Sequence, residues 1–428
     1  MAQIDPIKYT GRVTRITGLA VESIGPAVQI GEVCKIIDVK GQTSTLAEVV
    51  GFKDEKVLLM PFGNLTGVGL GSVVESTNRS LVVPVGMNMR GRILDGLGNP
   101  IDGKGPIQPE AYYPVDNEPF NPLKRMRITE PLPLGIRAID GMLTCGRGQR
   151  LGIFAGSGVG KSTLLGMIAR NTHADVNVVV LVGERGREVR DFIERDLQEE
   201  GLSRSVLVIA TSEQPALVRL KSAMIGTAIA EYFRDQGLHV MLLMDSLTRF
   251  AMAQREIGLA LGEPPVSRGY TPSVLAIMPR LLERAGTSDI GSITGLYTVL
   301  VDGDDMNEPI TDAVRGILDG HIVLSRNLAN QGHYPAIDVL ASISRVMPDI
   351  VSKEHLELSK EIRSIMAVYR SMEDLIHIGA YKKGSDPKLD RAVSLIAPIN
   401  QFLRQGTDER SSFTETIDRM SKIIRQSD

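Results

Sequence analysis

The glycine-rich run at 154–163, FAGSGVGKST, restricts the possible folds of this chain more than any other feature. It follows the apolar run Leu151–Phe154 and precedes the helix-like run Leu164–Arg170. In a strand–turn–helix of this kind, main-chain N–H groups point into the turn and the helix N-terminus adds partial positive charge. The pattern therefore predicts a phosphate-binding loop at the edge of a parallel sheet. A glycine-rich turn without a ligand is the alternative, and the context disfavours it.

The loop predicts a role for each of its polar side chains. Lys161 is expected to reach the β- and γ-phosphates, and the Ser162 hydroxyl is expected to bind Mg²⁺. Thr163 is placed to donate to an inner phosphate. The predicted nucleotide-binding residues of the loop are Gly156, Ser157, Gly158, Val159, Gly160, Lys161, Ser162 and Thr163. Ala155 replaces the glycine with which such loops usually begin.

Two acidic residues follow apolar runs that read as buried strands. Asp245 ends the run Val240–Met244, and Glu184 follows Val176–Val182. Since ligands bind outside the carboxyl ends of parallel strands, we expect both side chains near the loop. Asp245 is predicted to hold Mg²⁺ through water, and Glu184 to orient the attacking water. The alternatives are a helix cap for Asp245 and a structural salt bridge for Glu184.

The chain divides into three regions of different pattern. Short strands separated by glycines at 1–76 predict a small β-barrel domain. Apolar strands alternating with helical stretches at 77–350 predict parallel βαβ units. The core strands are predicted at Leu151–Phe154, Val176–Val182, Ser205–Ile209 and Val240–Met244. Helical periodicity follows at 351–428. The predicted fold is thus an α/β P-loop (RecA-like) parallel-sheet core, with an N-terminal β-barrel and a C-terminal helical domain.

Local signals place several elements within these regions. The barrel strands are predicted at Gly11–Ile16, Ala27–Ile30 and Lys56–Met60. The segment 106–133 is proline-rich and is predicted to be a wrapping loop. The pair Asp386–Pro387 predicts a helix start, and Ser412 with Glu415 predicts a capping box for a last helix.

Composition excludes several classes of protein. Hydrophobic residues make up 43% of the 428 residues and charged residues 23%, which is globular. A net charge of −3 and an aromatic content of 4% disfavour a nucleic-acid-binding protein. Two cysteines make no disulfide framework. The apolar runs are too short to span a membrane, and the first residues lack a signal-peptide pattern, so we expect a soluble, cytoplasmic protein.

Several segments of the sequence, taken in chain order, resemble the motifs of one protein family. They are FAGSGVGKST at 154–163, LVGERGREVRDFIE at 181–194, MDSLTRFAMAQREIGLALGEPPVSRGYTPSV at 244–274, VDGDDMNEPI at 301–310 and GHYPAIDVLASISRVM at 332–347. They resemble the hexameric rotary-type ATPases, which include the catalytic subunit of ATP synthase. The similarity covers nearly the whole chain and looks closest to the ATPases of flagellar and type III protein export.

The resemblance implies roles around the phosphates. Lys161 and Ser162 keep the roles predicted above, and Glu184 matches the family's catalytic carboxylate. Arg185 and Arg249 match arginines that surround the γ-phosphate.

It also implies roles further from the loop. Arg345 matches the arginine finger that reaches a neighbouring subunit's nucleotide, and Tyr334 matches an aromatic that stacks on adenine. The segment 401–405 resembles the chain leading to the far wall of the adenine pocket, with Phe413 as a further candidate. The alternatives are a helix cap or a pair with Asp349 for Arg345, and packing against the sheet for Tyr334.

The implied function is MgATP hydrolysis by a homohexameric ring, coupled to flagellar protein export. Implied partners are a coiled-coil stalk meeting the acidic loop 302–309, a stator-like regulator, the export gate, and export chaperones with their cargo. Peripheral association with the inner face of the cell membrane is expected, and nucleic acid is not. The alternatives are a virulence type III secretion ATPase and an ATP synthase or V-type catalytic subunit. Glu184 disfavours a non-catalytic ring subunit, and the net charge disfavours a nucleic-acid motor.

Overall fold

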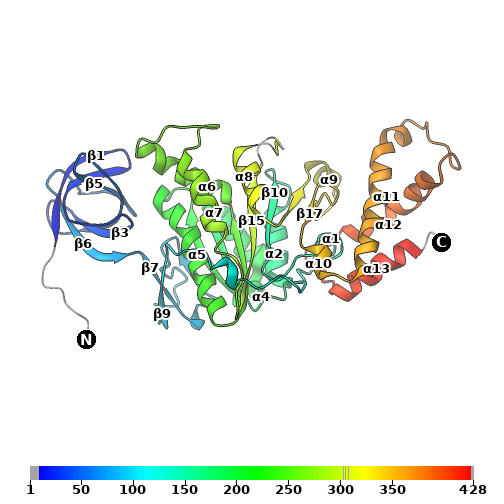
Figure 1. Cartoon of the computed structure of the whole chain (residues 1–428), viewed down its shortest axis with the longest axis horizontal. Helices are drawn as coiled ribbons and strands as arrows, with labels where there is room; N and C mark the ends of the chain where they lie inside the picture. The colour runs from blue at the N-terminus through cyan, green and yellow to red at the C-terminus, as the bar shows by residue number, and fades with distance from the viewer. Residues whose placement is uncertain (1–8, 302, 304, 307, 426–428) are drawn as a thin grey trace.

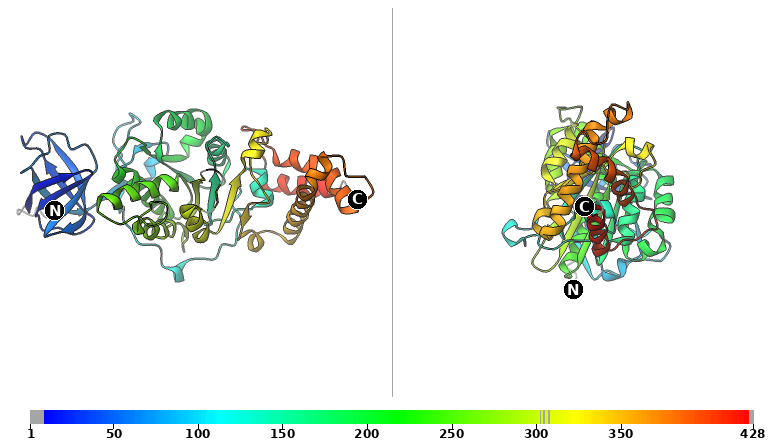
Figure 2. Two further views of the ribbon diagram at one scale, coloured as in Figure 1. Left: turned by 90° about the horizontal axis from the view of Figure 1, so that it is seen from above. Right: turned by 90° about the vertical axis from the view of Figure 1, so that its right-hand side faces the viewer.

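The computed structural model describes residues 9–301, 303, 305–306 and 308–425. Three parts follow one another along an elongated molecule (Figure 1). A β-barrel lies at one end, a sheet covered by helices lies in the middle, and a group of helices lies at the other end. Figure 2 shows the same order from above. The predicted fold class is confirmed, and the domain boundaries at 76 and 350 stay predictions.

The barrel is closed, with strand order β1-β2-β5-β4-β3-β6. Its strands are β1 Thr10–Thr17, β2 Ala20–Ile24, β3 Glu32–Ile37, β4 Ser44–Lys53, β5 Lys56–Pro61 and β6 Val73–Ser80. The predicted strand at Ala27–Ile30 is wrong, because these residues belong to the connection between β2 and β3. Gly25, at φ +64°, and Pro26, which has no N–H, end the strand before this segment.

The middle sheet has the strand order β17-β16-β10-β15-β13-β11-β12-β8, with β14 paired to β15. Its strands are β8 Ile93–Asp95, β10 Arg150–Ala155, β11 Val176–Glu184, β12 Ser205–Thr211, β13 His239–Asp245, β14 Gly286–Thr287, β15 Ser292–Leu300, β16 Gly320–Leu324 and β17 Ile343–Ser344. The four core strands predicted from apolar runs are all present. Sequence reasoning missed β15, which lies between β10 and β13.

Helices cover both faces of this sheet (Figure 1). They are α1 Arg137–Met142, α2 Lys161–Asn171, α3 Gly186–Asp191, the π-helical turn η3 Phe192–Leu197, α4 Gln198–Ser203, α5 Ala216–Asp235, α6 Leu247–Ala260, α7 Pro272–Leu282, α8 Pro309–Ile317, α9 Arg326–Asn330 and α10 Met347–Ile350. Alternate residues of β11 explain the two layers: Val178 and Val180 pack with α5, whereas Val179 and Leu181 pack with α2.

The segment 106–133 is only partly a loop. Its strand β9 Ala111–Pro114 pairs with β7 Val82–Val85 in a two-stranded sheet. Short 3₁₀ turns occur at η1 Met87–Met89 and η2 Pro122–Lys124. The prediction of an irregular wrapping loop is therefore corrected for β9, where alternating backbone contacts with β7 outweigh the local proline signal.

Three helices form the C-terminal part: α11 Lys353–His377, α12 Pro387–Leu403 and α13 Phe413–Arg425. Both predicted helix starts carry an N-cap, since the Asp386 side chain accepts from the Lys388 amide at 2.8 Å and Ser412 accepts from the Glu415 amide at 3.2 Å. The second is the serine half of the predicted capping box. Arg137 ties this part to the sheet domain by donating to the Phe402 carbonyl at 2.9 Å.

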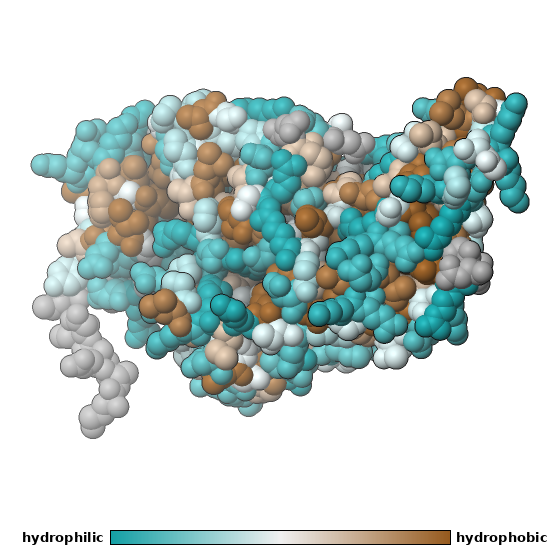
Figure 3. Space-filling model, turned by 45° about the vertical axis from the view of Figure 1, so that its right-hand side comes forward, coloured by the Kyte–Doolittle hydropathy of each residue, from teal (hydrophilic) through white to brown (hydrophobic). Residues whose placement is uncertain are grey.

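The far tip of the C-terminal part carries apolar side chains. Leu375 and Ile378, at the end of α11, are 46% and 75% exposed. Figure 3 shows hydrophobic atoms gathered at that tip. Among the helices that the structure describes, none is long and apolar enough to cross a membrane.

A buried ion pair gives the first testable prediction. Arg284 donates two bonds of 2.8 Å to Glu231 on α5, and both side chains are almost fully buried. We expect Arg284→Met to lower the free energy of unfolding by about 3–5 kcal/mol, because it leaves the Glu231 charge buried without its cation, with only the Asn117 amide donating to it at 3.2 Å. Urea denaturation measures the change. Arg190→Met, which removes an exposed pair with Glu194, is the control and should leave the midpoint unchanged. A change in Arg284→Met as small as the control's would contradict the prediction.

Candidate active site

The predicted phosphate loop joins the end of β10 to the start of α2. Gly158 and Gly160 adopt φ values of +76° and +89°, in the left-handed region that favours glycine. Together with neighbouring side chains the loop lines a cavity of about 390 Å³, formed by Gly156, Ser157, Gly158, Gly160, Lys161, Ser162, Thr163, Glu184, Arg185, Glu188, Arg249 and Leu300. Val159 differs from the other predicted loop residues, because its side chain is buried in the core.

Lys161 lies between the two predicted carboxylates. Its Nζ donates to Asp245 Oδ1 at 2.5 Å and lies 3.9 Å from Glu184 Oε1. The strand order of the sheet explains why the two carboxylates lie close together, because β11 and β13 are parallel neighbours that pair Leu181 with Asp245. The three residues, far apart in sequence, are thus collected at one edge of the sheet, where ligands of such sheets bind.

The environment of Glu184 changes its acidity. The pKa of Glu184 is raised from 4.5 to about 7, mainly by burial and then by the Asp245 charge, while the Lys161 charge acts in the opposite direction. A carboxyl group with a pKa near neutrality is suited to proton transfer, because both of its forms are populated at working pH. The nearby Glu188 side chain raises the pKa of Glu184 as well. The local electrostatics agree with the role predicted for Glu184 in orienting or deprotonating water.

The raised pKa predicts a pH-dependent gain in stability for Glu184→Gln. A carboxyl group whose folded-state pKa is raised contributes stability below its unfolded pKa, and this is lost as pH rises through the folded value. We therefore expect Glu184→Gln to raise the free energy of unfolding without nucleotide by about 3 kcal/mol at pH 8, and by less than about 1 kcal/mol at pH 5. Urea denaturation at the two pH values measures this. A gain of equal size at both would contradict the electrostatic cause.

The two other predicted arginines both reach the cavity. Arg185 is highly exposed and pairs with Glu188 at 3.4 Å, so its pairing is local and leaves the side chain open to solvent. Arg249 lies on α6, and its Nε is buried with no hydrogen-bond partner among the described residues. Arg249 is half-buried, and its Nη1 donates to the Met252 sulfur at 4.0 Å. A guanidinium that lines the loop cavity with one N–H unsatisfied suits an anionic ligand.

The predicted magnesium ligands offer oxygen donors only. Ser162 lines the cavity, and Asp245 lies behind it, in contact with Lys161. No cluster of three acidic, histidine or cysteine ligands occurs among the described residues. Since Mg²⁺ binds through one or two protein oxygens together with phosphates and waters, a hydroxyl and one carboxylate fit the ion when phosphate is present.

Tyr334 lies beside the loop. Its ring atoms are 3.4 and 3.5 Å from the point where a side chain on Gly160 would begin, and the residue is 45% exposed. Its carbonyl accepts from the Gln405 amide at 2.9 Å, so the segment 401–405 adjoins it. The role of this segment in an adenine pocket stays a prediction. Phe413 has a different place, because its ring packs edge-on against His355, with centroids 5.6 Å apart.

Arg345 lies away from the loop of its own chain. It follows β17, whose Ser344 pairs with Gly320 at the start of β16. The loop instead follows the other end of this part of the sheet, where Ala155 pairs with Leu324. Arg345 is exposed and donates to the Leu318 carbonyl at 3.3 Å. No ion pair with Asp349 occurs among the described residues, so the geometry leaves Arg345 available to another molecule.

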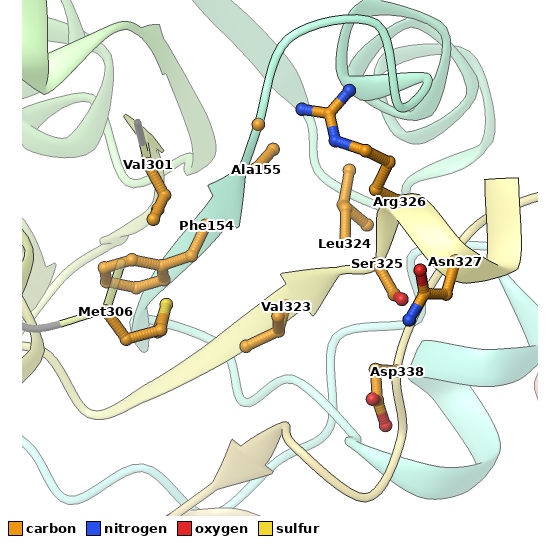
Figure 4. Close-up of a pocket in the computed structure, with 11 residues that line it drawn as sticks. Phe154, Ala155, Val301, Met306, Val323, Leu324, Ser325, Arg326, Asn327 and Asp338 are labelled. Carbon is orange, nitrogen blue, oxygen red and sulfur yellow. The ribbon is translucent and has the colours of Figure 1, made fainter. Parts of the chain in front are cut away.

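Sequence reasoning missed three residues of the site. Glu188 lines the cavity, Thr298 donates to Asp245 at 2.7 Å, and Arg326 donates to the Ser157 carbonyl at 3.2 Å. Arg326 also borders a second cavity of about 200 Å³ beside the loop, over Phe154 (Figure 4). The only sequence signal for Thr298 is that it is a polar residue inside a largely apolar run. This pattern does not predict which residue its hydroxyl bonds.

The fold and the site define a class. A loop with glycines in the left-handed region joins a parallel strand to a helix, and a lysine meets two carboxylates at the ends of neighbouring strands. This is the arrangement of a P-loop nucleoside triphosphatase.

Comparison with known proteins narrows the class. Residues 135–344 match the ATP synthase alpha/beta family, nucleotide-binding domain, and residues 13–78 match its beta-barrel domain. Residues 351–422 match the T3SS EscN ATPase C-terminal domain. The chain belongs to the ATP synthase alpha/beta family.

Relatives with high identity cover almost the whole chain. The flagellum-specific ATP synthase of Bacillus subtilis is 57% identical over 98% of this chain and 96% of its own length. The type 3 secretion system ATPase of Xanthomonas euvesicatoria is 51% identical over 96% and 93%. The solved structure of the assembled ATPase EscN in complex with its central stalk EscO, from the enteropathogenic E. coli type III secretion system, matches with a TM-score of 0.90 at 46% identity, over 97% of this chain and 100% of that one.

Proposed function

We propose that this chain is a Mg²⁺-dependent ATPase that works as a homohexameric ring in flagellar protein export. The observation that carries the enzymatic part is the meeting of Lys161, Glu184 and Asp245 at the phosphate loop. Family membership supports ATP as the nucleotide.

The chain's own residues divide the chemistry between them. The loop amides and Lys161 bind the phosphates, and Tyr334 contacts the base. Glu184 orients a water molecule in line with the γ-phosphate and receives its proton. Bound Mg²⁺ supplies positive charge for the developing phosphoryl anion, and Ser162 and Asp245 would hold it. Arg249, and Arg345 of an adjacent subunit, add further positive charge.

Similarity to export ATPases supports the cellular role. The match of 351–422 to the T3SS EscN C-terminal domain favours an export ATPase over an ATP synthase or V-type subunit. Flagellar export is favoured over virulence secretion by the higher identity of the flagellar relative, 57% against 51%. In this role, opening and closing of the ring would release chaperones and unfold cargo at the export gate, with the protein in the cytoplasm and at the inner face of the membrane beside its stator-like regulator.

A central stalk is the partner with the most support, because the structurally similar EscN binds one. We propose that the acidic loop 302–309 meets it. Asp304 lies outside the described residues. Asp305 and Glu308 pair with Arg268 of the same chain at 2.8 and 4.0 Å, so a basic stalk would compete with Arg268 for these two carboxylates.

Steady-state ATPase measurements on the purified chain test the proposal. We expect hydrolysis that EDTA abolishes and whose specific activity rises with protein concentration as subunits assemble. An active enzyme whose specific activity is independent of concentration would contradict the ring. A chain that assembles but hydrolyses no ATP with Mg²⁺ would contradict the enzymatic function.

A further inference from the structure

Asp245 is held on one of its two carboxylate oxygens. Oδ1 accepts both from Lys161 Nζ at 2.5 Å and from the Thr298 hydroxyl at 2.7 Å. No hydrogen bond from the described residues reaches Oδ2. Oδ1 of the carboxylate therefore already accepts two hydrogen bonds, whereas Oδ2 can still accept one.

Strand pairing brings Thr298 to this place. Strands β13 and β15 run parallel with Met244 paired to Tyr297, so Asp245 and Thr298 are the next residues along the two strands. Thr298 is fully buried and Asp245 is 4% exposed. The hydroxyl is thus held rigidly by the sheet rather than by a loop.

The carboxylate needs such an anchor. Rotation about the last bond of an aspartate side chain has broad minima, so a single partner fixes the plane of the carboxylate poorly. Lys161 is a poor anchor in addition, because its role with the phosphates requires it to move its charge toward the ligand. Thr298 is neutral and fixed in the strand. Its hydroxyl lies 3.3 Å from the Met244 carbonyl, a second and more distant acceptor, and 2.7 Å from Asp245.

We propose that Thr298 is a positioning residue that fixes the Asp245 carboxylate, with Oδ1 occupied and Oδ2 open to a water molecule of bound Mg²⁺. The inference rests on the proposed MgATP site and adds to it a residue from the strand that sequence reasoning missed. It predicts that the hydroxyl of Thr298 affects the magnesium-dependent part of nucleotide binding and leaves the magnesium-independent part unchanged.

Thr298→Val removes the hydroxyl at nearly constant volume, and Thr298→Ser restores it. Thr294→Val is the matched control, because Thr294 is a buried threonine of the same strand that accepts from the Gly148 amide at 2.7 Å, at the end of β15 opposite the phosphate loop. Binding of a fluorescent ATP analogue is measured with EDTA and during a Mg²⁺ titration. Thermal melting of each variant reports folding separately.

We expect Thr298→Val to raise the Mg²⁺ concentration for half-maximal tightening of binding about tenfold, with binding in EDTA unchanged. Thr298→Ser should behave as the wild type, and Thr294→Val should change melting alone. If Thr298→Val fails to fold, Thr298→Ala is the second hydroxyl-free variant and must show the same shift. In an Asp245→Asn background, Thr298→Val should add no further shift.

Two results would overturn the inference. One is a Thr298→Val protein with wild-type Mg²⁺ dependence, and the other is an equal shift in Thr294→Val. Failure of the proposed function gives a different result, because the wild type itself would then bind the analogue equally well with EDTA and with Mg²⁺.

Discussion

Glu184→Gln is expected to lower ATP turnover by about 10²–10⁴-fold while MgATP binding stays close to that of the wild type. Glutamine keeps the size of the side chain and its hydrogen-bonding oxygen, but it accepts no proton. In the proposed mechanism the phosphate contacts come from the loop and Lys161, which the substitution leaves in place, so we expect binding to be preserved. Steady-state hydrolysis and equilibrium binding of an ATP analogue measure the two effects separately.

Glu188→Gln is the matched control for this experiment. Glu188 lines the same cavity and lies close enough to bond the Glu184 carboxyl group, yet it is more exposed and pairs with Arg185. We expect its turnover to stay within about tenfold of the wild type. Turnover of Glu184→Gln above a tenth of the wild-type value, or a larger loss in Glu188→Gln, would remove Glu184 from the proposed role.

Arg345→Ala is expected to keep nucleotide binding and lose the rise in specific activity with protein concentration. An arginine supplied by an adjacent subunit contributes about 10³–10⁵-fold to turnover in enzymes of this kind. In this chain Arg345 follows β17, at the end of the sheet opposite the phosphate loop. We therefore expect it to complete a site only in another copy. Specific activity measured against protein concentration, beside the wild type, tests the expectation, with sedimentation to show that the variant still assembles.

Mixing the two inactive variants gives a sharper test. In a ring assembled from equal amounts of Glu184→Gln and Arg345→Ala subunits, roughly one interface in four combines an intact Glu184 with an intact Arg345. Activity should therefore reappear on mixing, although neither variant is active alone. If Arg345 acted within its own chain, every subunit in the mixture would still lack one of the two residues, and the mixture would stay inactive.

Local sequence signals were enough to predict the structure wherever it depends on the conformation and pattern of a few neighbouring residues. The glycines of the loop, the apolar runs of β10, β11, β12 and β13, and the caps at Asp386 and Ser412 were predicted from the sequence and are present. The strand predicted at Ala27–Ile30 was wrong, because β2 ends before Gly25 and Pro26 and the residues that follow connect it to β3. It also missed β15, whose threonines and glycine interrupt the apolar pattern.

The sequence by itself determined that a glycine-rich loop would join a strand to a helix and that Glu184 and Asp245 would end buried strands, because main-chain geometry and apolar patterning act over a few residues. Only the tertiary structure decided which groups donate hydrogen bonds to the Asp245 carboxylate, which strand lies between β10 and β13, and that Arg345 lies away from the phosphate loop of its own chain. Those facts follow from strand order and register, which depend on packing between residues distant in the chain. Thr298 illustrates the difference: its chemistry is visible in the sequence, but its partner is set by the pairing of β13 with β15.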